Sequence, residues 1–374
     1  IAVRILFVFG GRSCESDVSV LTGLLAMSAA DGEKYNAVPL YISASGEFFT
    51  GDKLKSLETF KNADGDFSKV AVKATFVPPD KAVYTIRKGK LIRGDVISAI
   101  VDCCHGGAGE DGSLSGYFAF FDVPVCSPGV FAGAVSMDKA ATKTFLKAIG
   151  VLTPDFIKVP AIEDRDEAVK TVKKRLGYPV IVKPLTLGSS VGIGVALSEA
   201  ELNERMNYAY RFDDTVIVEE YLAGAEEFNC AAYKKDGKVV VSECERPVFK
   251  GNILSFDDKY LCGKREFPAK IKKELSDKIK AVTLKVYGAL SFTGIIRIDY
   301  LYHSGKLYLN EINSVPGSLA LYLFSEDPKN FKTVITDIIE EGEREFNRKN
   351  SAIKSIKTGI FSSSGSKGSK GAKR

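Results

Sequence analysis

The 374-residue sequence is poor in the side chains that bind transition metals. It has only two histidines and seven cysteines, and no two cysteines stand in a CxxC arrangement. This scarcity excludes a zinc site with the usual ligand spacing. Cys103 and Cys104 are adjacent, so they cannot easily bridge to each other. An odd number of scattered cysteines without a secretion signal fits a reducing compartment, and we expect a cytoplasmic location.

Long apolar runs and a basic face are also missing. No apolar stretch reaches the ~18 residues of a membrane span, and the start, IAVRILFVFGG, resembles a first strand rather than a signal peptide. The net charge of +5 is misleading, because eight basic residues and no acidic residue occur from Arg348 onward. Removing these eight charges from +5 leaves −3 on the rest of the chain. No basic face with interleaved aromatic residues marks a nucleic-acid surface.

The hydrophobic pattern predicts alternating strands and helices. With 45% hydrophobic and 26% charged residues, the chain should form two or three globular domains. An almost entirely apolar strand at 2–9 suits a parallel strand that is buried on both faces. The first half should contain a helix at 17–30, strands at 37–42, 96–103 and 123–126, a hairpin at 83–93, a helix at 114–121 and a helix that includes Met137-Asp138-Lys139. The region 51–80 has no firm pattern.

The second half should form two further α+β units. The expected elements are helices at 163–176, 199–211, 270–287 and 327–348, strands at 180–183, 193–197 and 216–220, and a hairpin at 227–244 that turns at Asp236-Gly237. The stretch 245–266 is polar and lacks a clear period. Long loops of this kind often act as lids over a site. The tail 351–374 is rich in Gly, Ser and Lys and should be disordered.

Two paired strands are expected in RIDYLYHSGKLYLNEINSVPG, residues 297–317. Arg297 and Asp299 leave the first strand on one face, and Glu311 and Asn313 do the same on the second. Hard oxygen ligands without histidine or cysteine suit Mg²⁺, which usually binds a few carboxylates together with phosphate oxygens. A neighbouring arginine suits the stabilisation of an oxyanion. The alternative interpretation is a solvated strand face, but three ligand types in phase favour a metal site.

Two glycine-rich segments follow predicted strands. Lys183 ends an apolar strand, and the loop after it, PLTLGSSVG, offers hydroxyls and backbone N–H groups that can bind phosphate. This loop is not the GxxxxGK[ST] motif of the common nucleotide hydrolases. The segment HGGAGEDG, residues 105–112, lies at a strand end where α/β sheets bind ligands. For Glu110 and Asp111 of this segment, capping of the next helix is an alternative about as well supported as a functional role.

The order of eight motifs resembles the D-alanine–D-alanine ligases of the ATP-grasp superfamily. The motifs, from about residue 3 to residue 345, are GGRSCESDVS, HGGAGEDG, MDK, KPLTLGSSVG, EEYLAGAEEF, DDKY, RIDY and NEINSVPG. The resemblance implies an ATP-grasp architecture with an N-terminal parallel-sheet α/β domain at 1–135, a small central α+β domain at 136–215 and a C-terminal α+β domain at 216–350. ATP would lie between the last two, under the lid at 245–266.

The resemblance also implies a reaction and its cofactors. ATP would phosphorylate the carboxylate of one D-alanine, and the amine of a second would attack the acyl phosphate to form the dipeptide for peptidoglycan synthesis, which maintains the cell wall and cell shape. ATP and two Mg²⁺ ions, or Mn²⁺, would be needed, and the chain would form a homodimer. Phosphoryl transfer between anions depends on charge neutralisation and alignment, which lysines and a metal supply.

Motif by motif, the resemblance assigns residues to four groups. Five residues would bind the first substrate, form the oxyanion site or act on other active-site groups: Glu15, Ser189, Arg297, Gly317 and Tyr260. The nucleotide would contact Lys139, Lys183, Ser189, Ser190, Glu219, Glu220, Leu222, Lys259 and Glu227, or Glu226 in place of Glu227 because this chain has one extra residue there. The metal ions would bind Asp299, Glu311 and Asn313. The second substrate would contact Ser318, Tyr322 and Leu323.

Two departures from the family pattern concern the loop and the second substrate. Leu187 stands where many members have a glutamate, and Tyr322 stands where many have a serine that binds the carboxylate of the second substrate. Relatives that accept D-lactate or D-serine are therefore the main alternative. Alternatives of other kinds are a nucleotide-binding protein that has lost turnover and a kinase that stops at a phosphorylated product. The complete set of predicted catalytic residues argues against the first. Glu15 and Arg297, which suit the capture of an amino acid and a tetrahedral oxyanion, argue against the second.

Overall fold

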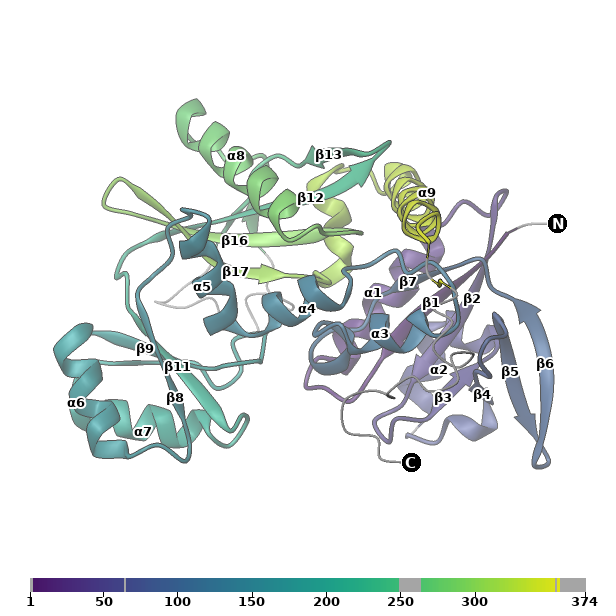
Figure 1. Ribbon diagram of the computed structural model, residues 1–374, viewed down its shortest axis with the longest axis horizontal. Helices are drawn as coiled ribbons and strands as arrows, with labels where there is room; N and C mark the ends of the chain where they lie inside the picture. Colours follow the sequence, from purple (N-terminus) through teal and green to yellow (C-terminus); the bar gives the residue numbers. More distant parts are fainter. Residues whose placement is uncertain (1–2, 64, 249–263, 354, 357–374) are drawn as a thin grey trace, which may run out of the picture.

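The computed structural model describes residues 3–63, 65–248, 264–353 and 355–356 (Figure 1). Within these ranges the chain forms one seven-stranded sheet, two four-stranded sheets and a two-stranded ribbon, with helices packed on the sheets. The predicted mixed α/β class is confirmed. Most of the predicted lid and nearly all of the predicted disordered tail lie outside the described residues. No described helix has both the length and the apolar character needed to cross a membrane.

The N-terminal sheet is mixed rather than wholly parallel. Its strands are β1 Val3–Gly10, β2 Tyr35–Ile42, β3 Phe48–Thr50, β4 Val72–Thr75, β5 Ala82–Arg87, β6 Lys90–Val96 and β7 Ala99–Asp102. The spatial order is β6-β5-β4-β3-β2-β1-β7. The central strand β1 is parallel to β2 and β7, whereas every pair from β2 to β6 is antiparallel. The expected strand at 123–126 is only an isolated bridge to β7.

The apolar sequence of β1 is explained by burial on both faces. Helices α1 Ser16–Ala29 and α3 Ser113–Ala119 pack on this sheet, and the short helix α2 Leu57–Asn62 lies in the region that has no sequence pattern. Ile5, Phe7 and Phe9 share a core with α1, while Leu6 and Val8 share another with α3. Successive side chains of a strand point to opposite faces, so a strand between two cores needs apolar residues at every position.

The helix expected across Met137-Asp138-Lys139 is two helices. These are α4 Val130–Met137 and α5 Lys139–Ala148. Asp138 has an extended backbone and its side chain accepts a hydrogen bond of 2.8 Å from the Ala141 N–H, which makes it the N-cap of α5. Because the chain breaks here, Lys139 lies in the first turn of α5 instead of mid-helix.

The central sheet is antiparallel throughout. Its strands are β8 Phe156–Pro160, β9 Val180–Pro184, β10 Gly194–Ala196 and β11 Thr215–Glu220, in the order β10-β9-β11-β8. Helices α6 Arg165–Arg175 and α7 Glu199–Ala209 pack against it and bury an aliphatic core. Pairing of Ile217 with Lys183 in the middle of this sheet brings Glu219, two residues further along β11, to the same face as Lys183.

The C-terminal sheet has two hairpins, as predicted. Its strands are β12 Glu226–Lys235, β13 Lys238–Val241, β16 Ile296–His303 and β17 Lys306–Asn313, in the order β13-β12-β16-β17. The turns fall at Asp236-Gly237 and Ser304-Gly305, and all four residues have positive φ. Two consecutive residues with positive φ are characteristic of the type I′ turn that matches the strand twist. Helix α8 Lys273–Ala289 covers one face of the sheet (Figure 1).

One apolar core joins the N-terminal and C-terminal sheets. It contains side chains of β1, β12, the 3₁₀ segment Gly317–Leu323 and the last helix, α9 Phe331–Asn350. In Figure 1, α9 lies between the two sheets. The ribbon of β14 Arg246–Pro247 and β15 Arg265–Glu266 lies beside β12, since Glu245 forms a bridge with Asn229. Residues far apart in the sequence therefore meet at this junction.

Replacing Gly342 with alanine should destabilise the protein. A Cβ atom on this residue of α9 would lie 2.5 Å from Cys126 Sγ and 3.1 Å from Cys126 Cα. Overpacking of this kind costs about 1–3 kcal/mol. The control is Gly288→Ala in α8, where nothing lies within 4 Å of the added atom, and alanine should stabilise the helix by about 1 kcal/mol. Urea titrations would measure both; equal midpoints for the two variants would contradict this account of the packing.

Candidate functional site

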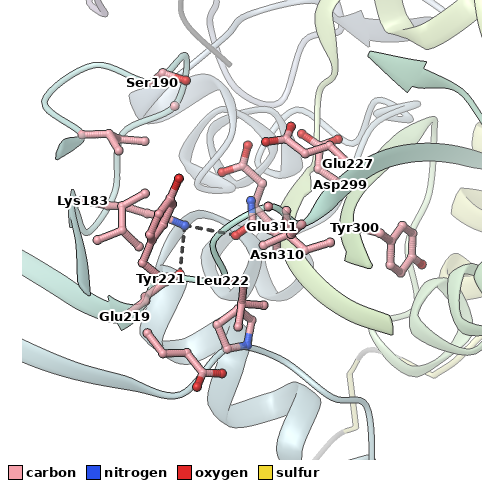
Figure 2. A pocket seen from close by; sticks show the side chains of 18 of the residues that line it. Lys183, Ser190, Glu219, Tyr221, Leu222, Glu227, Asp299, Tyr300, Asn310 and Glu311 are labelled. Carbon is pink, nitrogen blue, oxygen red and sulfur yellow. Dashed lines mark hydrogen bonds and ion pairs between the residues drawn. The ribbon is translucent and has the colours of Figure 1, made fainter. Parts of the chain in front are cut away.

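Two adjoining cavities lie where the three large sheets meet. The first is lined by the central and C-terminal sheets, and its lining includes Lys183, Leu187, Glu219, Glu220, Tyr221, Leu222, Glu227, Asp299, Asn310 and Glu311 (Figure 2). The second also draws on α1 and the 3₁₀ segment, and its lining includes Glu15, Thr22, His105, Glu110, Ser189, Glu245, Arg265, Arg297, Asn313, Gly317, Ser318 and Tyr322. Gly188 lines both, so the glycine-rich loop lies between them.

The β16–β17 pair carries polar side chains into both cavities. Asp299 lies directly opposite Glu311, and both line the first cavity. Arg297 lies directly opposite Asn313, and both line the second. The sequence predicts that these four side chains come together; the individual pairs depend on a shift in register between Asp299 and Tyr300, because Tyr300 pairs with Leu309 whereas Asp299 pairs with Glu311. Two residues of strand span about 7 Å, so one step along this ladder separates the two groups.

The guanidinium of Arg297 is bound to the carboxylate of Asp299. Nε donates to Oδ1 at 2.7 Å and Nη2 donates to Oδ2 at 2.9 Å. The two side chains are about 15% and 13% exposed, so the pair is largely shielded from water. Asp299 therefore interacts with the predicted oxyanion arginine as well as belonging to the predicted metal set.

The predicted metal ligands suit Mg²⁺ only when oxygens of a bound nucleotide or of water complete the coordination. Among the residues that the structure describes, no three His, Cys, Asp or Glu side chains gather as a metal-binding group. Asp299 and Glu311 supply two carboxylates and Asn313 an amide oxygen. Mg²⁺ is commonly held by one or two carboxylates together with waters and substrate phosphates, so this donor set suits it when a nucleotide is bound.

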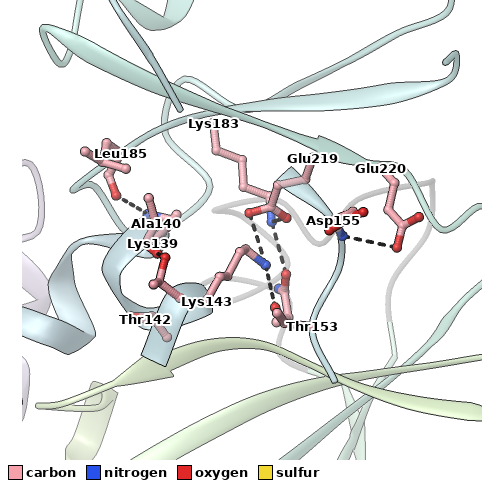
Figure 3. Close-up of polar contacts among 12 residues, drawn as sticks. Lys139, Ala140, Thr142, Lys143, Thr153, Asp155, Lys183, Leu185, Glu219 and Glu220 are labelled. Carbon is pink, nitrogen blue, oxygen red and sulfur yellow. Dashed lines mark hydrogen bonds and ion pairs between the residues drawn. The ribbon is translucent and has the colours of Figure 1, made fainter. Parts of the chain in front are cut away.

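A buried ionic network forms one wall of the first cavity (Figure 3). Lys183 Nζ donates to Glu219 Oε2 at 2.9 Å and to Asn310 Oδ1 at 3.0 Å. On the other side of Glu219, Lys143 Nζ lies 3.3 Å from Oε1 and donates to Thr153 Oγ1 at 3.0 Å. Lys143 and Glu219 are almost completely buried. With two lysines and one glutamate the network carries a net positive charge, which suits an anionic ligand.

Burial and pairing shift the pKa values in this network in different directions. Burial lowers the pKa of Lys143 to about 8, although Glu219 opposes the shift. For Glu219, burial favours the neutral form, but Lys143 and Lys183 outweigh it and hold the pKa below its ordinary value. For Lys183, the attraction of Glu219 and Glu311 outweighs burial, and its pKa is raised. Lys183 and Glu219 are thus a charged pair at neutral pH.

The glycine-rich loop is fixed at both of its ends. Asp213 Oδ2 accepts hydrogen bonds of 2.8 Å from both the N–H and the hydroxyl of Thr186. Lys139, which is buried, donates to the carbonyl groups of Leu185 and Leu187. Ser189 donates to Glu15 Oε1. The loop therefore joins the predicted phosphate lysine Lys139 to the predicted first-substrate residue Glu15.

His105 is buried beneath the second cavity. Nδ1 lies 2.8 Å from the Val315 carbonyl oxygen, an acceptor, so this nitrogen must carry the proton. Nε2 then accepts from the Thr22 hydroxyl at 2.7 Å, and the same hydroxyl accepts from the Ser318 N–H at 3.0 Å. Burial lowers the pKa of His105 to about 4, which keeps the ring neutral. The network fixes the entry of the chain into the 3₁₀ segment.

Glu110 links the HGGAGEDG segment to β17. Its carboxylate accepts from the N–H groups of Gly106 at 2.7 Å and Val315 at 3.3 Å. Burial, with Glu15 adding to it, raises its pKa to about 7. The alternative role of Glu110 as a helix cap is not what the structure shows, because the helix N-cap position is Gly112.

The segment after Pro316-Gly317 has an unusual backbone. Ser318, Leu319 and Ala320 all have φ between 47° and 53°, in the left-handed region that L-residues rarely adopt consecutively. Leu319 and Ala320 are buried in the junction core. The turn directs Tyr322 into the second cavity, where its ring lies 4.3 Å from the guanidinium carbon of Arg265.

The structure brings most of the predicted site residues to the two cavities. The exceptions are Leu323, whose side chain is buried in the junction core, Lys139, which lies behind the loop, and Lys259 and Tyr260, which lie outside the described residues. Glu220 and Ser190 line the first cavity. Of the two candidates for the ribose, Glu227 lines the first cavity, whereas Glu226 pairs with Arg246 at 3.2 Å.

Sequence reasoning missed five residues that the structure places in or beside the cavities: Lys143, His105, Glu110, Asn310 and Arg265. Lys143 follows Lys139 by one helical turn, and this spacing was the available signal. His105 and Glu110 stood in a recognised motif without an assigned role. Asn310 likewise stood in a recognised motif, NEINSVPG, without an assigned role. Arg265 carried no signal, because its importance depends on contacts with distant residues.

Two family models match the chain. One describes the D-ala D-ala ligase N-terminus and covers residues 4–128, and the other describes the D-ala D-ala ligase C-terminus and covers residues 145–340. A D-alanine–D-alanine ligase of Thermosipho melanesiensis is 35% identical over 365 residues, or 94% of this chain and 96% of the relative. One from Thermosipho africanus is 35% identical over 372 residues, or 96% and 98%.

Solved structures share the fold. The D-alanine-D-alanine ligase of Coxiella burnetii superposes with a TM-score of 0.81 at 20% identity, covering 94% of this chain and 96% of that one. The VanG D-Ala:D-Ser ligase of Enterococcus faecalis superposes with a TM-score of 0.77 at 25% identity, covering 91% and 100%.

Replacing His105 with glutamine should reduce the loss of stability in acid. The pKa of His105 is about 4 in the folded protein, whereas the ordinary value for histidine is 6.5. Between these values only the unfolded chain binds the proton, so the free energy of unfolding falls as pH decreases, by about 3 kcal/mol. Urea titrations at pH 7 and pH 4.5 would measure the difference, with His303→Gln as the control. An unchanged pH dependence in His105→Gln would contradict the burial of a neutral imidazole.

Proposed function

The chain belongs to the D-alanine–D-alanine ligase family, and we propose that its two cavities carry out that reaction: the ATP-dependent joining of two D-alanines. The product would serve as a peptidoglycan precursor. The observation that carries the proposal is the β16–β17 ladder. Its Asp299–Glu311 pair lines the first cavity and its Arg297–Asn313 pair lines the second. A phosphoryl donor in one cavity and a carboxylate in the other would meet along this ladder.

The first cavity binds ATP in this proposal. Leu222, Glu219 and Glu220 line the part of this cavity that takes the adenine, and Glu227 accepts hydrogen bonds from the ribose hydroxyls. The positive charge of the Lys143–Glu219–Lys183 network supports an anionic ligand here. Lys183 reaches the phosphates from the end of β9, and Ser190 offers a hydroxyl from the loop. Lys139 contacts the carbonyl groups of Leu185 and Leu187 and so holds the loop that carries the phosphate-binding groups. Its predicted contact with the ATP phosphates stays a proposal.

Magnesium would be held by Asp299, Glu311 and Asn313 with phosphate oxygens, as two ions, and manganese would fit the same oxygen donors. When bound, these ions neutralise charge on the phosphates. Because Asp299 also pairs with Arg297, its carboxylate links the metal set to the oxyanion arginine. This link fixes the separation between the metal set, which would face the phosphates, and Arg297, which would face the reacting carbonyl group.

The second cavity binds both amino acids. Glu15 accepts hydrogen bonds from the ammonium group of the first D-alanine, and Ser189 orients Glu15. The first carboxylate attacks the γ-phosphate, which releases ADP and forms an acyl phosphate. The amine of the second D-alanine attacks the acyl carbon, and the oxygen that gains negative charge is stabilised by Arg297 and the Gly317 N–H. Collapse of this intermediate releases phosphate. Lys259 and Tyr260, also expected to take part, lie outside the described residues.

Ligation with a different second substrate is the alternative. Tyr322 supports it, because it lies in the second cavity where many family members have a carboxylate-binding serine. A D-serine-accepting ligase is also among the similar structures. D-lactate or D-serine would then replace the second D-alanine. The three-domain division at 135 and 215, the homodimer and the cytoplasmic location stay predictions.

The deciding experiment is to measure ADP release with ATP, Mg²⁺ and D-alanine alone, with products identified by mass, and then with D-lactate or D-serine added. Efficient formation of D-alanyl-D-alanine is the expected result. A mixed product formed only with the added partner would establish the alternative. ATP binding without turnover under any condition would refute a ligase of this family.

Replacing Glu311 or Asp299 with alanine should abolish turnover, because each change removes a carboxylate from the metal set. ADP release would be measured across a range of Mg²⁺ concentrations, and Mn²⁺ binding to the protein–ADP complex would be followed separately by its paramagnetic signal. The control is Glu226→Ala, since Glu226 pairs with Arg246 outside the first cavity. Near-normal activity of Glu311→Ala at moderate Mg²⁺ would refute the metal assignment.

Replacing Arg297 with alanine should lower kcat by roughly 10²–10³, the usual effect of removing one oxyanion donor. The KM for ATP should change little. Single-turnover kinetics would separate acyl phosphate formation from peptide formation, and the loss should fall on peptide formation. An unchanged kcat would show that Arg297 only supports Asp299 structurally.

A further inference from the structure

We propose that Arg265 binds the carboxylate of the second amino-acid substrate and that Tyr322 supports it. This inference rests on the proposed function. It assigns to Arg265 the binding of the carboxylate, which a serine performs in many members of the family. Arg265 begins β15, more than fifty residues before Tyr322 in the sequence. Both side chains line the second cavity, together with Ser318 and Arg297.

The position of the Arg265 guanidinium is set from two sides. Its carbon atom lies 4.3 Å from the centre of the Tyr322 ring. Its Nη1 lies 3.6 Å from Glu245 Oε1. Glu245 is itself fixed, because its Oε2 accepts from the Asn229 amide at 3.0 Å and the two backbones form a β-bridge. An aromatic ring below and a carboxylate beside the guanidinium restrict its position without enclosing it, since the Arg265 side chain is 36% exposed.

This arrangement leaves the guanidinium able to bind another anion. Stacking on an aromatic ring uses the face of the guanidinium, whereas its N–H donors lie in the plane and point outward. The Glu245 contact of 3.6 Å is longer than the 2.7–2.9 Å typical of a charge-assisted hydrogen bond. A substrate carboxylate can therefore be bound in the plane of the guanidinium while the ring contact is kept.

The charges in the second cavity favour such a cation. Its lining includes the carboxylates Glu15, Glu110 and Glu245, and an acceptor carboxylate brings one more negative charge. Arg297 is already bound through two hydrogen bonds to Asp299 and is the predicted oxyanion residue. Arg265 and Lys264 are the other basic residues that line the described part of this cavity. Of these two, Arg265 has its position fixed by the contacts just described.

The assignment also gives Tyr322 a different task from the one expected of a hydroxyl group. The ring, rather than the phenolic oxygen, supports the carboxylate-binding residue. A tyrosine in place of the family serine is then compatible with the same substrate, because the arginine replaces the lost hydrogen bond with a charged one. Arg265 would recognise the α-carboxylate shared by D-alanine, D-serine and D-lactate and would reject acceptors that lack it.

The test compares two acceptors that differ only in this group. D-Alanine and D-alaninamide are offered together as second substrates with ATP, and mass spectrometry gives the ratio of the dipeptide to the dipeptide amide. In the wild type we expect a strong preference for the carboxylate. In Arg265→Gln this preference should fall by about ten- to a hundred-fold, the range expected for hydrogen bonds to a charged group. Arg265→Lys should restore part of it, since it keeps the charge but loses the planar donors.

Three further variants separate the possible explanations. Arg246→Gln is the matched control, because Arg246 also pairs with glutamates and stacks on a ring, that of Phe228, yet does not line either cavity. It should keep the wild-type preference. Tyr322→Phe should also keep it, whereas Tyr322→Ala should lose much of it. If Lys264→Gln or Tyr322→Phe abolishes the preference and Arg265→Gln does not, the assignment to Arg265 is wrong.

The outcome distinguishes this inference from the function on which it rests. A wild-type enzyme that forms no D-alanyl-D-alanine refutes the proposed function. A wild-type enzyme that forms the dipeptide, with an unchanged acceptor preference in Arg265→Gln, refutes only the role of Arg265. Retained ATP binding by Arg265→Gln, measured by titration calorimetry, would show that the variant is folded, and the KM for ATP and for the first D-alanine should remain close to the wild-type values.

Discussion

The pairing of β16 with β17 is the constraint on which the rest of the site depends. In this register Asp299 lies opposite Glu311 and Arg297 lies opposite Asn313, and the four side chains share one face of the sheet. A slip of one residue would turn one strand's polar pair toward the opposite face, where the core contains Ile298 and Ile312. The apolar residues between the polar ones oppose such a slip, and a shift in register between Asp299 and Tyr300 sets the observed pairs: Tyr300 pairs with Leu309, but Asp299 pairs with Glu311.

The second constraint is the neutralisation of buried charge. Glu219 lies between Lys143 and Lys183, and removing one partner of such a buried group typically costs several kcal/mol because a charge is left uncompensated. The burial of Glu219 therefore depends on both lysines. They come from different elements, Lys143 from α5 and Lys183 from β9. Helix α5 begins at Lys139 after the break at Asp138, and Lys143, one turn later, lies against Glu219 of β11.

Local patterns predicted many of the strands, the hairpins and the motif residues, but they missed β3, β4 and β8, and the strand expected at 123–126 is only an isolated bridge. Alternation along 297–313 gave the correct face for four polar side chains, and the turns at Asp236-Gly237 and Ser304-Gly305 were predicted from local chemistry. The break at Asp138 was missed because the apolar pattern continues through it. Arg265 was missed for a different reason. Its proposed role depends on contacts with Tyr322 and Glu245, and contacts between residues far apart in the chain produce no periodic pattern in the sequence.

The electrostatics of the second cavity suggest why its ligands must bind together. Burial, with the neighbouring Glu15 adding to it, raises the pKa of Glu110 to about 7, so a further negative charge near Glu110 is disfavoured before substrates bind. The ammonium group of the first amino acid offsets the negative charge at Glu15, which makes the addition of a second carboxylate less unfavourable. Arg265 then needs to offset only the charge that the acceptor brings. Binding of the first substrate should thus favour binding of the second, because each cation that enters the cavity lowers the electrostatic cost of the next anion.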